Sequence, residues 1–210
     1  MVSVVPAGQV SVADLMERYG LEIAEMEVPE WTNLATPSDT ALSDTEKHYL
    51  DRIKTNFTRL MRQPPLLENS VKMLVLSPLL DRVGFYDAPY RIESETSVEL
   101  ALEDEDTIIR GRIDVLVPQE QLWILVLESK RSDFAVNGAI GQALAYMLGS
   151  PNAGPTFGMI TNGNDFLFLK LIQQPQPRYA HSKLFSLLNP GNDLYAVLQV
   201  LKRIGDAIRL

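Results

Sequence analysis

The chain contains no cysteine, which excludes a disulfide scaffold, a thiolate metal site and a cysteine nucleophile. It has only two histidines, His48 and His181, so a bound metal ion would take mainly oxygen ligands. It has no run of about 18 apolar residues, and its first residues lack the basic and apolar regions of a signal peptide. We therefore expect a cytoplasmic protein with no membrane partner.

The composition is that of a folded domain. Of 210 residues, 46% are hydrophobic and 22% are charged, which excludes wholesale disorder. The net charge of -8 argues against a surface that coats nucleic acid broadly, because such surfaces neutralise many phosphates with Lys and Arg. The charge is uneven, and residues 131–210 carry 7 basic and 4 acidic side chains.

We expect the chain to divide into a flank and one domain. Residues 1–42 show no sustained hydrophobic period, which predicts an irregular or partly helical flank, and residues 43–210 are predicted to form the domain. Ser43 and Glu46 resemble a capping box, and the apolar spacing after them predicts a helix over 43–62. A second helix is predicted from Leu66 to Gly84, with a kink or a new turn at Pro78.

The remaining pattern predicts a mixed sheet. Three short apolar segments indicate an antiparallel meander, a later pair joined by Asn162-Gly163-Asn164 indicates a hairpin, and two apolar stripes indicate helices. The predicted strands are 98–103, 107–117, 122–129, 156–161 and 165–171, and the predicted helices are 135–149 and 193–209. The fold class is therefore α/β, with a mixed central sheet flanked by helices.

Three charged residues interrupt two strands that are otherwise apolar. Asp114 lies in the segment GRIDVLV, and Glu128 and Lys130 lie in LVLESKR. Side chains at i and i+2 of a strand share a face, so Glu128 and Lys130 point the same way. Charges placed in apolar strands need a compensating partner, which makes these residues candidates for a site.

The register of the hairpin decides whether Asp114 joins that face. Pairing Val117 with Leu122 places Asp114 opposite Leu125, on the wrong face. Pairing Val117 with Trp123 places Asp114 diagonal to Glu128. A shared site therefore requires an odd loop or a bulge.

Two converging carboxylates repel each other, and a hard divalent cation such as Mg²⁺ or Mn²⁺ relieves that repulsion. The cation would also bind a phosphate oxygen and activate water, while Lys130 would orient the water or balance the developing charge. This chemistry is phosphodiester hydrolysis. A Glu-x-Lys triplet alone is common by chance, so the hypothesis depends on the strands, the spacing and the following helix.

These residues resemble the D…ExK core of the PD-(D/E)xK nuclease superfamily, with Ile113-Asp114 in place of the usual Pro-Asp. The chain is more specifically similar to the amino-terminal nuclease domain of type I restriction enzyme R subunits. That likeness covers residues 66–172 and includes LLENSVKMLVLSPLLDRVGF, ESKR and FGMITNGNDFLFLKL. It implies that residues 43–210 contain a restriction-endonuclease-like core.

The resemblance also implies roles for individual residues. Asp114, Glu128 and the backbone carbonyl of Ser129 would bind the metal ion, Glu68 would complete the site, and Lys130 would be catalytic. Glu93, Glu95 and Glu99 compete with Glu68 for its role, and an acid in the first turn of a helix is in any case favoured by the helix dipole.

Gln142 and Tyr146 match a Q-x-x-x-Y motif of some of these nucleases, and their spacing of four places both on one helical face. There they would orient nucleic acid or Lys130. The alternative is that both pack on the sheet. A further set of basic residues is a candidate phosphate track: Arg110, Arg112, Arg131, Lys170, Arg178 and Lys183.

The expected function is therefore a Mg²⁺-dependent DNA endonuclease. The chain holds no G-x-x-x-x-G-K-[ST] phosphate loop and has no room for a motor, so we expect a nuclease module alone. A homodimer is a candidate assembly, because cutting both strands of a duplex requires two active sites. The alternative is a catalytically inactive nuclease-fold protein that binds nucleic acid or a protein partner.

Overall fold

The computed structural model describes residues 3–24, 41–62, 68–90, 92–101, 107–117, 122–126, 139–151 and 154–208. Within these residues, nine strands form one mixed sheet with the order β1-β4-β5-β6-β7-β8-β2, in which β3 also pairs with β4 and β9 with β7. The strands are β1 Ser3–Pro6, β2 Glu22–Ile23, β3 Glu93–Ala101, β4 Thr107–Val117, β5 Leu122–Val126, β6 Thr156–Thr161, β7 Asp165–Ile172, β8 Arg178–His181 and β9 Phe185–Ser186. The mixed α/β class is confirmed.

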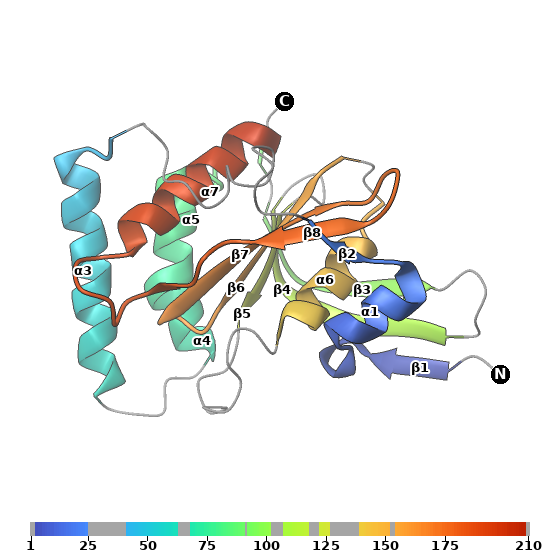
Figure 1. Ribbon diagram of the computed structural model, residues 1–210. Helices are drawn as coiled ribbons and strands as arrows, with labels where there is room; N and C mark the ends of the chain where they lie inside the picture. The colour runs from blue at the N-terminus through green and yellow to red at the C-terminus, as the bar shows by residue number, and fades with distance from the viewer. Residues whose placement is uncertain are drawn as a thin grey trace.

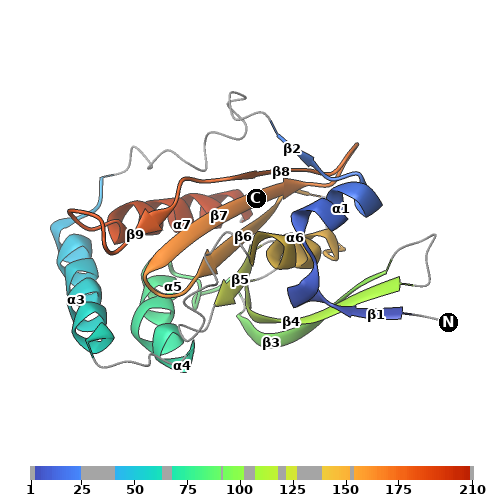
Figure 2. The same cartoon turned by 60° about the horizontal axis from the view of Figure 1, so that its bottom comes forward.

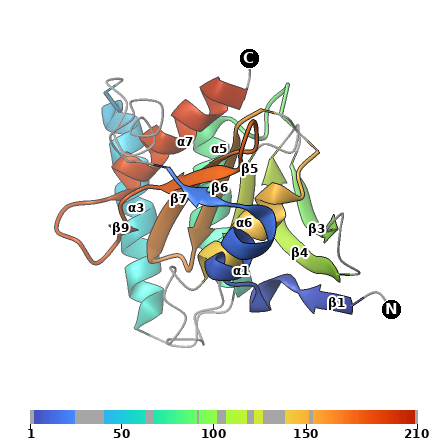
Figure 3. The same ribbon diagram turned by 45° about the vertical axis from the view of Figure 1, so that its right-hand side comes forward.

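Helices cover both faces of this sheet (Figures 1 and 2). The helices α3, α5 and α7 lie on one side, and α1 and α6 lie on the other, as Figure 3 shows from a second direction. The described helical segments are η1 Ala7–Gln9, α1 Val12–Tyr19, α3 Asp44–Met61, α4 Glu68–Val71, η2 Lys72–Leu76, α5 Ser77–Val83, α6 Ile140–Leu148 and α7 Leu194–Ile208. None of them is long and apolar enough to cross a membrane.

The capping box at the start of α3 is confirmed. The Ser43 hydroxyl accepts a hydrogen bond from the Glu46 amide, and the Glu46 carboxylate accepts one from the Ser43 amide at 2.8 Å. These bonds satisfy amide groups that have no partner inside the helix. The helix then presents Leu50, Ile53 and Phe57 to the core.

The second predicted helix is a continuous helical run from Glu68 to Val83 whose middle part, η2, is a π-helix. Pro78 lies in the first turn of α5, immediately after η2. A proline has no amide hydrogen, and its ring displaces the carbonyl four residues earlier, so the wider π turn accommodates it. Gly84 ends the run with a φ of 84°.

The central strands follow the predicted order. β3, β4 and β5 form an antiparallel meander, α6 follows β5 in the chain, and β6 returns parallel to β5. β6 and β7 form the predicted hairpin, in which Asn162 Oδ1 accepts hydrogen bonds from the Asn164 and Asp165 amides. Gly163 takes a φ of 85° in this turn.

The amino-terminal segment contains more regular structure than the predicted flank. β1 pairs in parallel with β4, and β2 pairs in parallel with β8. Between them, α1 packs in the same core as α6. Residues 3–24 therefore form part of the sheet and of its helical cover, while 25–40 lie outside the described residues.

Two apolar cores lie on the two faces of the sheet. The first joins Phe57 of α3, Phe168 of β7 and Leu198 of α7, all of which are fully buried. The second joins α1 and α6 to the opposite face of the same strands through Leu144, Ile160 and others. The alternation of β6 and β7 residues between the two cores is that of strands buried on both faces.

Candidate functional site

The structure places the backbone of Asp114 within β4 and Glu68 at the start of α4. Glu128, Ser129 and Lys130 lie outside the described residues and follow the end of β5 at Val126. The predicted metal and catalytic residues are therefore placed only in part.

The register of the β4–β5 hairpin is the one that places Asp114 and Glu128 on opposite faces in the absence of a bulge. Val117 pairs with Leu122, and Val115 pairs with Ile124, so the pairing of Val117 with Trp123 is wrong. This pairing leaves four residues, 118–121, between the paired ends, whereas the odd loop that a shared site requires would leave five. Only a bulge can then bring Asp114 and Glu128 to one face.

The meander singles out Glu95 among the competing acids. Ser94 pairs with Val115 and Thr96 pairs with Ile113, so Glu95 takes the register position beside Asp114 on the neighbouring strand. Glu99 instead pairs with Arg110. Residues side by side on adjacent strands share a face of the sheet. Glu95 is thus better placed by register to join Asp114 than the sequence pattern indicated.

Gln142 and Tyr146 lie on one face of α6, as their spacing predicted. The Gln142 side-chain amide donates a hydrogen bond to the Tyr146 hydroxyl at 2.9 Å. Tyr146 is 2% exposed and belongs to the core beneath α6. Packing on the sheet therefore accounts for Tyr146, while the hydrogen bond fixes the direction of the half-buried Gln142 side chain.

A close backbone approach positions α6. A Cβ atom at Gly141 would lie 2.3 Å from the Val10 carbonyl oxygen, so only glycine permits this contact between α6 and the segment before α1. The same approach brings Gln142 near Gly8, where a Cβ atom would lie 3.7 Å from the Gln142 side-chain oxygen. The amino-terminal segment thus forms part of the wall around Gln142.

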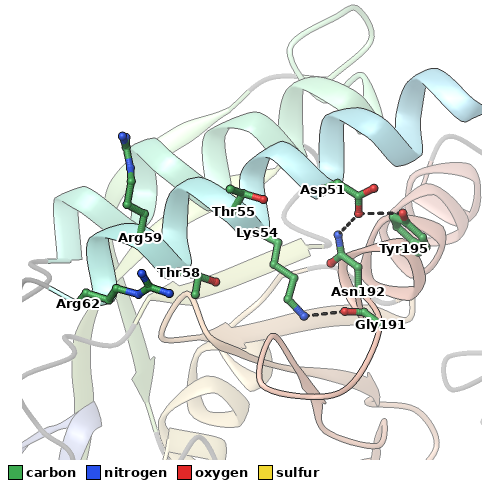
Figure 4. Close-up of a pocket in the computed structure, with 9 residues that line it drawn as sticks. All are labelled: Asp51, Lys54, Thr55, Thr58, Arg59, Arg62, Gly191, Asn192 and Tyr195. Atoms are coloured by element: carbon green, nitrogen blue, oxygen red, sulfur yellow. Dashed lines mark hydrogen bonds between the residues drawn. The ribbon is translucent and has the colours of Figure 1, made fainter.

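A second candidate site is a groove of about 730 Å³ between α3 and the loop that leads into α7 (Figure 4). Apart from Gly191, its lining residues have polar or charged side chains, three of them basic, although much of the surface that they present to the groove is the apolar part of those side chains. The lining residues are Asp51, Lys54, Thr55, Thr58, Arg59, Arg62, Gly191, Asn192 and Tyr195. We refer to it as the α3 groove.

Hydrogen bonds across the α3 groove fix its two walls. Lys54 donates from Nζ to the Gly191 carbonyl at 2.6 Å and to the Asn189 carbonyl at 3.3 Å. Asp51 Oδ1 accepts from Asn192 at 2.9 Å and from the Tyr195 hydroxyl at 2.8 Å, and these bonds lower the pKa of Asp51. The one carboxylate of the α3 groove therefore already has hydrogen-bond partners within the groove lining.

Sequence reasoning missed the α3 groove, although one signal was present. The segment from Arg52 to Arg62, the C-cap of α3, carries four basic residues and no acidic one, in a chain whose net charge is -8. The opposite wall comes from residues 191–195, more than 120 positions away in the sequence, and no local pattern predicts that they meet.

No group of three His, Asp or Glu side chains that could hold a metal ion occurs among the residues that the structure describes. The carboxylates and the backbone carbonyl expected to bind Mg²⁺ are nevertheless the hard oxygen donors that this ion prefers.

No family model matches the chain, and no curated protein matches it.

Proposed function

We propose that the protein is a metal-dependent nuclease that hydrolyses DNA phosphodiester bonds, with a restriction-endonuclease-like core. The observation that carries this proposal is the order and direction of the elements around Asp114. A helical run, the β3–β4–β5 meander, α6 and the parallel strand β6 follow one another along the chain, and this order supports a core of that kind. Asp114 lies on the middle strand of that meander, and Glu128 follows its last strand.

The proposal requires a bulge, and the described pairing restricts where the bulge can lie. β5 keeps regular pairing with β6 through Val126 and Thr161, so no extra residue is inserted up to that point. The pairing of β4 with β3 has the same register before and after Asp114, so neither strand has an extra residue there. The bulge that the proposal requires would therefore have to come after Val126 and before Glu128, where one extra residue would reverse the face of Glu128 and Lys130.

The proposed residues then have complementary roles. Asp114, Glu128 and the Ser129 carbonyl hold Mg²⁺ or Mn²⁺, with Glu68 or Glu95 as a further carboxylate. The bound ion would supply a Lewis acid for the phosphate and lower the pKa of a coordinated water. Lys130 balances negative charge that develops on the phosphate.

Cleavage of plasmid DNA tests this proposal. The purified protein should cut DNA with Mg²⁺ or Mn²⁺ and not in EDTA. Asp114→Asn and Lys130→Met should each lower the cleavage rate by about 100-fold or more, which is the usual cost of removing one group that stabilises the transition state. The melting temperature of each variant should stay near that of the wild type.

Glu103→Gln serves as the control, because it removes a carboxylate from the nearby acidic run 103–106, which lacks the alternating ligands of a calcium loop. This variant should cut like the wild type. Undiminished cleavage by Asp114→Asn would end the proposal.

The hairpin register favours a second candidate, a catalytically inactive protein of the same fold. Without a bulge at Leu127, the pairing of Val117 with Leu122 leaves Asp114 and Glu128 on opposite faces. Such a protein would bind nucleic acid or a protein partner without cutting. Failure to cleave single-stranded and double-stranded DNA and RNA in Mg²⁺ and Mn²⁺ would select this candidate.

A further inference from the structure

We propose that the α3 groove binds the phosphate backbone of a nucleic-acid strand. The choice of nucleic acid as the ligand rests on the proposed function, whereas the affinity for phosphate follows from the groove itself. Its basic residues, its hydroxyl groups and its position relative to β5 each support this assignment.

The basic residues of the α3 groove are available to a ligand. Arg59 and Arg62 are exposed, and within the described part of the chain neither forms an ion pair. Lys54 uses its ammonium group to bind two carbonyl groups, but its full charge remains in the groove. Three positive charges thus line a groove whose carboxylate, Asp51, is already held by Asn192 and Tyr195.

The spacing of these residues suits an extended chain of phosphates. Lys54, Thr58 and Arg62 follow one another at intervals of four residues, so they form a stripe along one side of α3. Eight residues of helix span about 12 Å, which matches about four nucleotides of a strand that rises 3.4 Å per nucleotide. In Figure 4, Arg62 lies beside Thr58. Arg59 points away from the other labelled side chains, so its exposed guanidinium has to turn toward the groove to meet a phosphate.

The dipole of α3 makes Arg59 and Arg62 necessary for binding an anion at this end of the helix. Arg59 and Arg62 lie in and just after the last turn of the helix, where the carbonyl ends give a partial negative charge. A helix end of this kind repels an anion, so phosphate binding here depends on the basic side chains. Neutralising them should therefore remove the attraction and leave a net repulsion.

The basic end of α3 lies at the edge of the sheet where β5 ends. Val126, the last residue of β5, pairs with Thr161, and the turn after Thr161 packs on α3. A Cβ atom at Gly163 would lie 2.8 Å from the Phe57 ring. Arg62 follows Phe57 by five residues, or about 8 Å along the helix. A strand held in the α3 groove would therefore pass the carboxyl end of β5.

The test measures nucleic-acid binding in EDTA, so that cleavage plays no part. Fluorescence anisotropy would follow a labelled 20-nucleotide single strand and a matched duplex across a series of salt concentrations. The groove variant is Arg59→Gln/Arg62→Gln. The matched control is Lys47→Gln/Arg52→Gln, which removes the same charge from the same helix at positions outside the groove lining.

We expect the groove variant to bind more weakly and with a shallower salt dependence. Each phosphate contact contributes about 0.7 to the slope of log K against log salt for a single strand, so two lost contacts lower it by about 1.4. The advantage of the wild type should then shrink about sevenfold between 50 and 200 mM salt. The melting temperature should not change, because both arginines are exposed.

Several results would overturn the proposal. They are an unchanged affinity and slope in the groove variant, an equal loss in the control, or no binding of either probe by the wild type. Displacement of the labelled strand by millimolar inorganic phosphate at matched ionic strength would show a small-anion site instead.

Cleavage in Mg²⁺, measured separately, distinguishes this proposal from the proposed function. Groove-dependent binding without cleavage would support the α3 groove and refute the nuclease.

Discussion

Glu46 joins the N-cap of α3 to α7 through a single carboxylate. It caps α3 through the Ser43 amide, accepts a hydrogen bond from the Ser43 hydroxyl, and forms an ion pair with Lys202 of α7. Its side chain is only 18% exposed. The Lys202 ammonium, together with the bonds from Ser43, lowers the pKa of Glu46 from 4.5 to about 2.

We predict that Glu46→Gln destabilises the protein in a pH-dependent way. At pH 7 the free energy of unfolding should fall by about 1–2 kcal/mol, because a charge-assisted hydrogen bond and an ion pair are lost. A carboxyl group with a lowered pKa stabilises the fold above its unfolded value of 4.5, and this contribution is lost as pH falls toward about 2. Urea unfolding at pH 7, 4 and 3 would show that the difference in free energy of unfolding between the wild type and the variant becomes smaller as the pH falls.

Asp44→Asn is the control for that series. Asp44 lies in the same first turn of α3 and also has a basic partner, Lys47, whose Nζ lies 3.6 Å from Asp44 Oδ1. Unlike Glu46, the Asp44 side chain is fully exposed. Exposed pairs of this kind contribute little to stability. An identical gap for Glu46→Gln at pH 3 and pH 7 would contradict the linkage between the ion pair and folding.

At the scale of elements, the sequence predicted the helices after residue 42 and the central strands, but not the helix α1. Long apolar stripes specified α3 and α7, and short apolar segments between turn residues specified β4, β6 and β7. The sequence did not predict the short strands, which have only two to four residues each: β1, β2, β8 and β9. Their pairing partners are distant in the sequence, and half-exposed residues such as Val4 and Ile23 leave no alternating pattern.

The candidate site was predictable in its residue types and less so in its geometry. Asp114 stood out because a charge in an apolar strand is costly. Its register relative to Glu128 depends on a single residue in the loop or strand, and hydrophobicity does not determine that residue. Likewise, the position of Glu95 beside Asp114 follows from the pairing of β3 with β4, which no local pattern fixes.

The β6–β7 hairpin carries a testable contact between elements. Gly163 combines a φ of 85° with close packing, because an added Cβ atom would lie 2.8 Å from Phe57 and 2.9 Å from Val71. We predict that Gly163→Ala lowers the free energy of unfolding by about 2–4 kcal/mol, through backbone strain and overpacking together. Urea unfolding monitored by circular dichroism would measure this loss.

Gly191→Ala separates the two contributions. Gly191 has a similar φ of 82°, but an added Cβ atom there meets nothing within 4 Å. This variant should lose only the backbone part, about 1–2 kcal/mol. Equal losses at the two glycines would show that the contact of the hairpin with α3 and α4 contributes nothing.

At the scale of the whole molecule, a local basic surface has to act against a net charge of -8. Such a charge repels a polyanion at long range, and salt screens this repulsion as well as the attraction at the α3 groove. The protein therefore differs from one that coats nucleic acid, in which six to ten phosphate contacts are common. Its affinity should come from a few contacts on one surface.

We predict from this charge distribution that the wild-type protein binds a single strand with a weak salt dependence. The three basic residues of the α3 groove would give a slope of log K against log salt of about -2, because each contact contributes about -0.7. The long-range repulsion makes the slope shallower still, since added salt relieves it. Anisotropy titrations between 50 and 200 mM salt measure this slope directly. A slope of about -5 or steeper would require a larger basic surface than the α3 groove supplies, and the strand would then have to follow a different path across the protein.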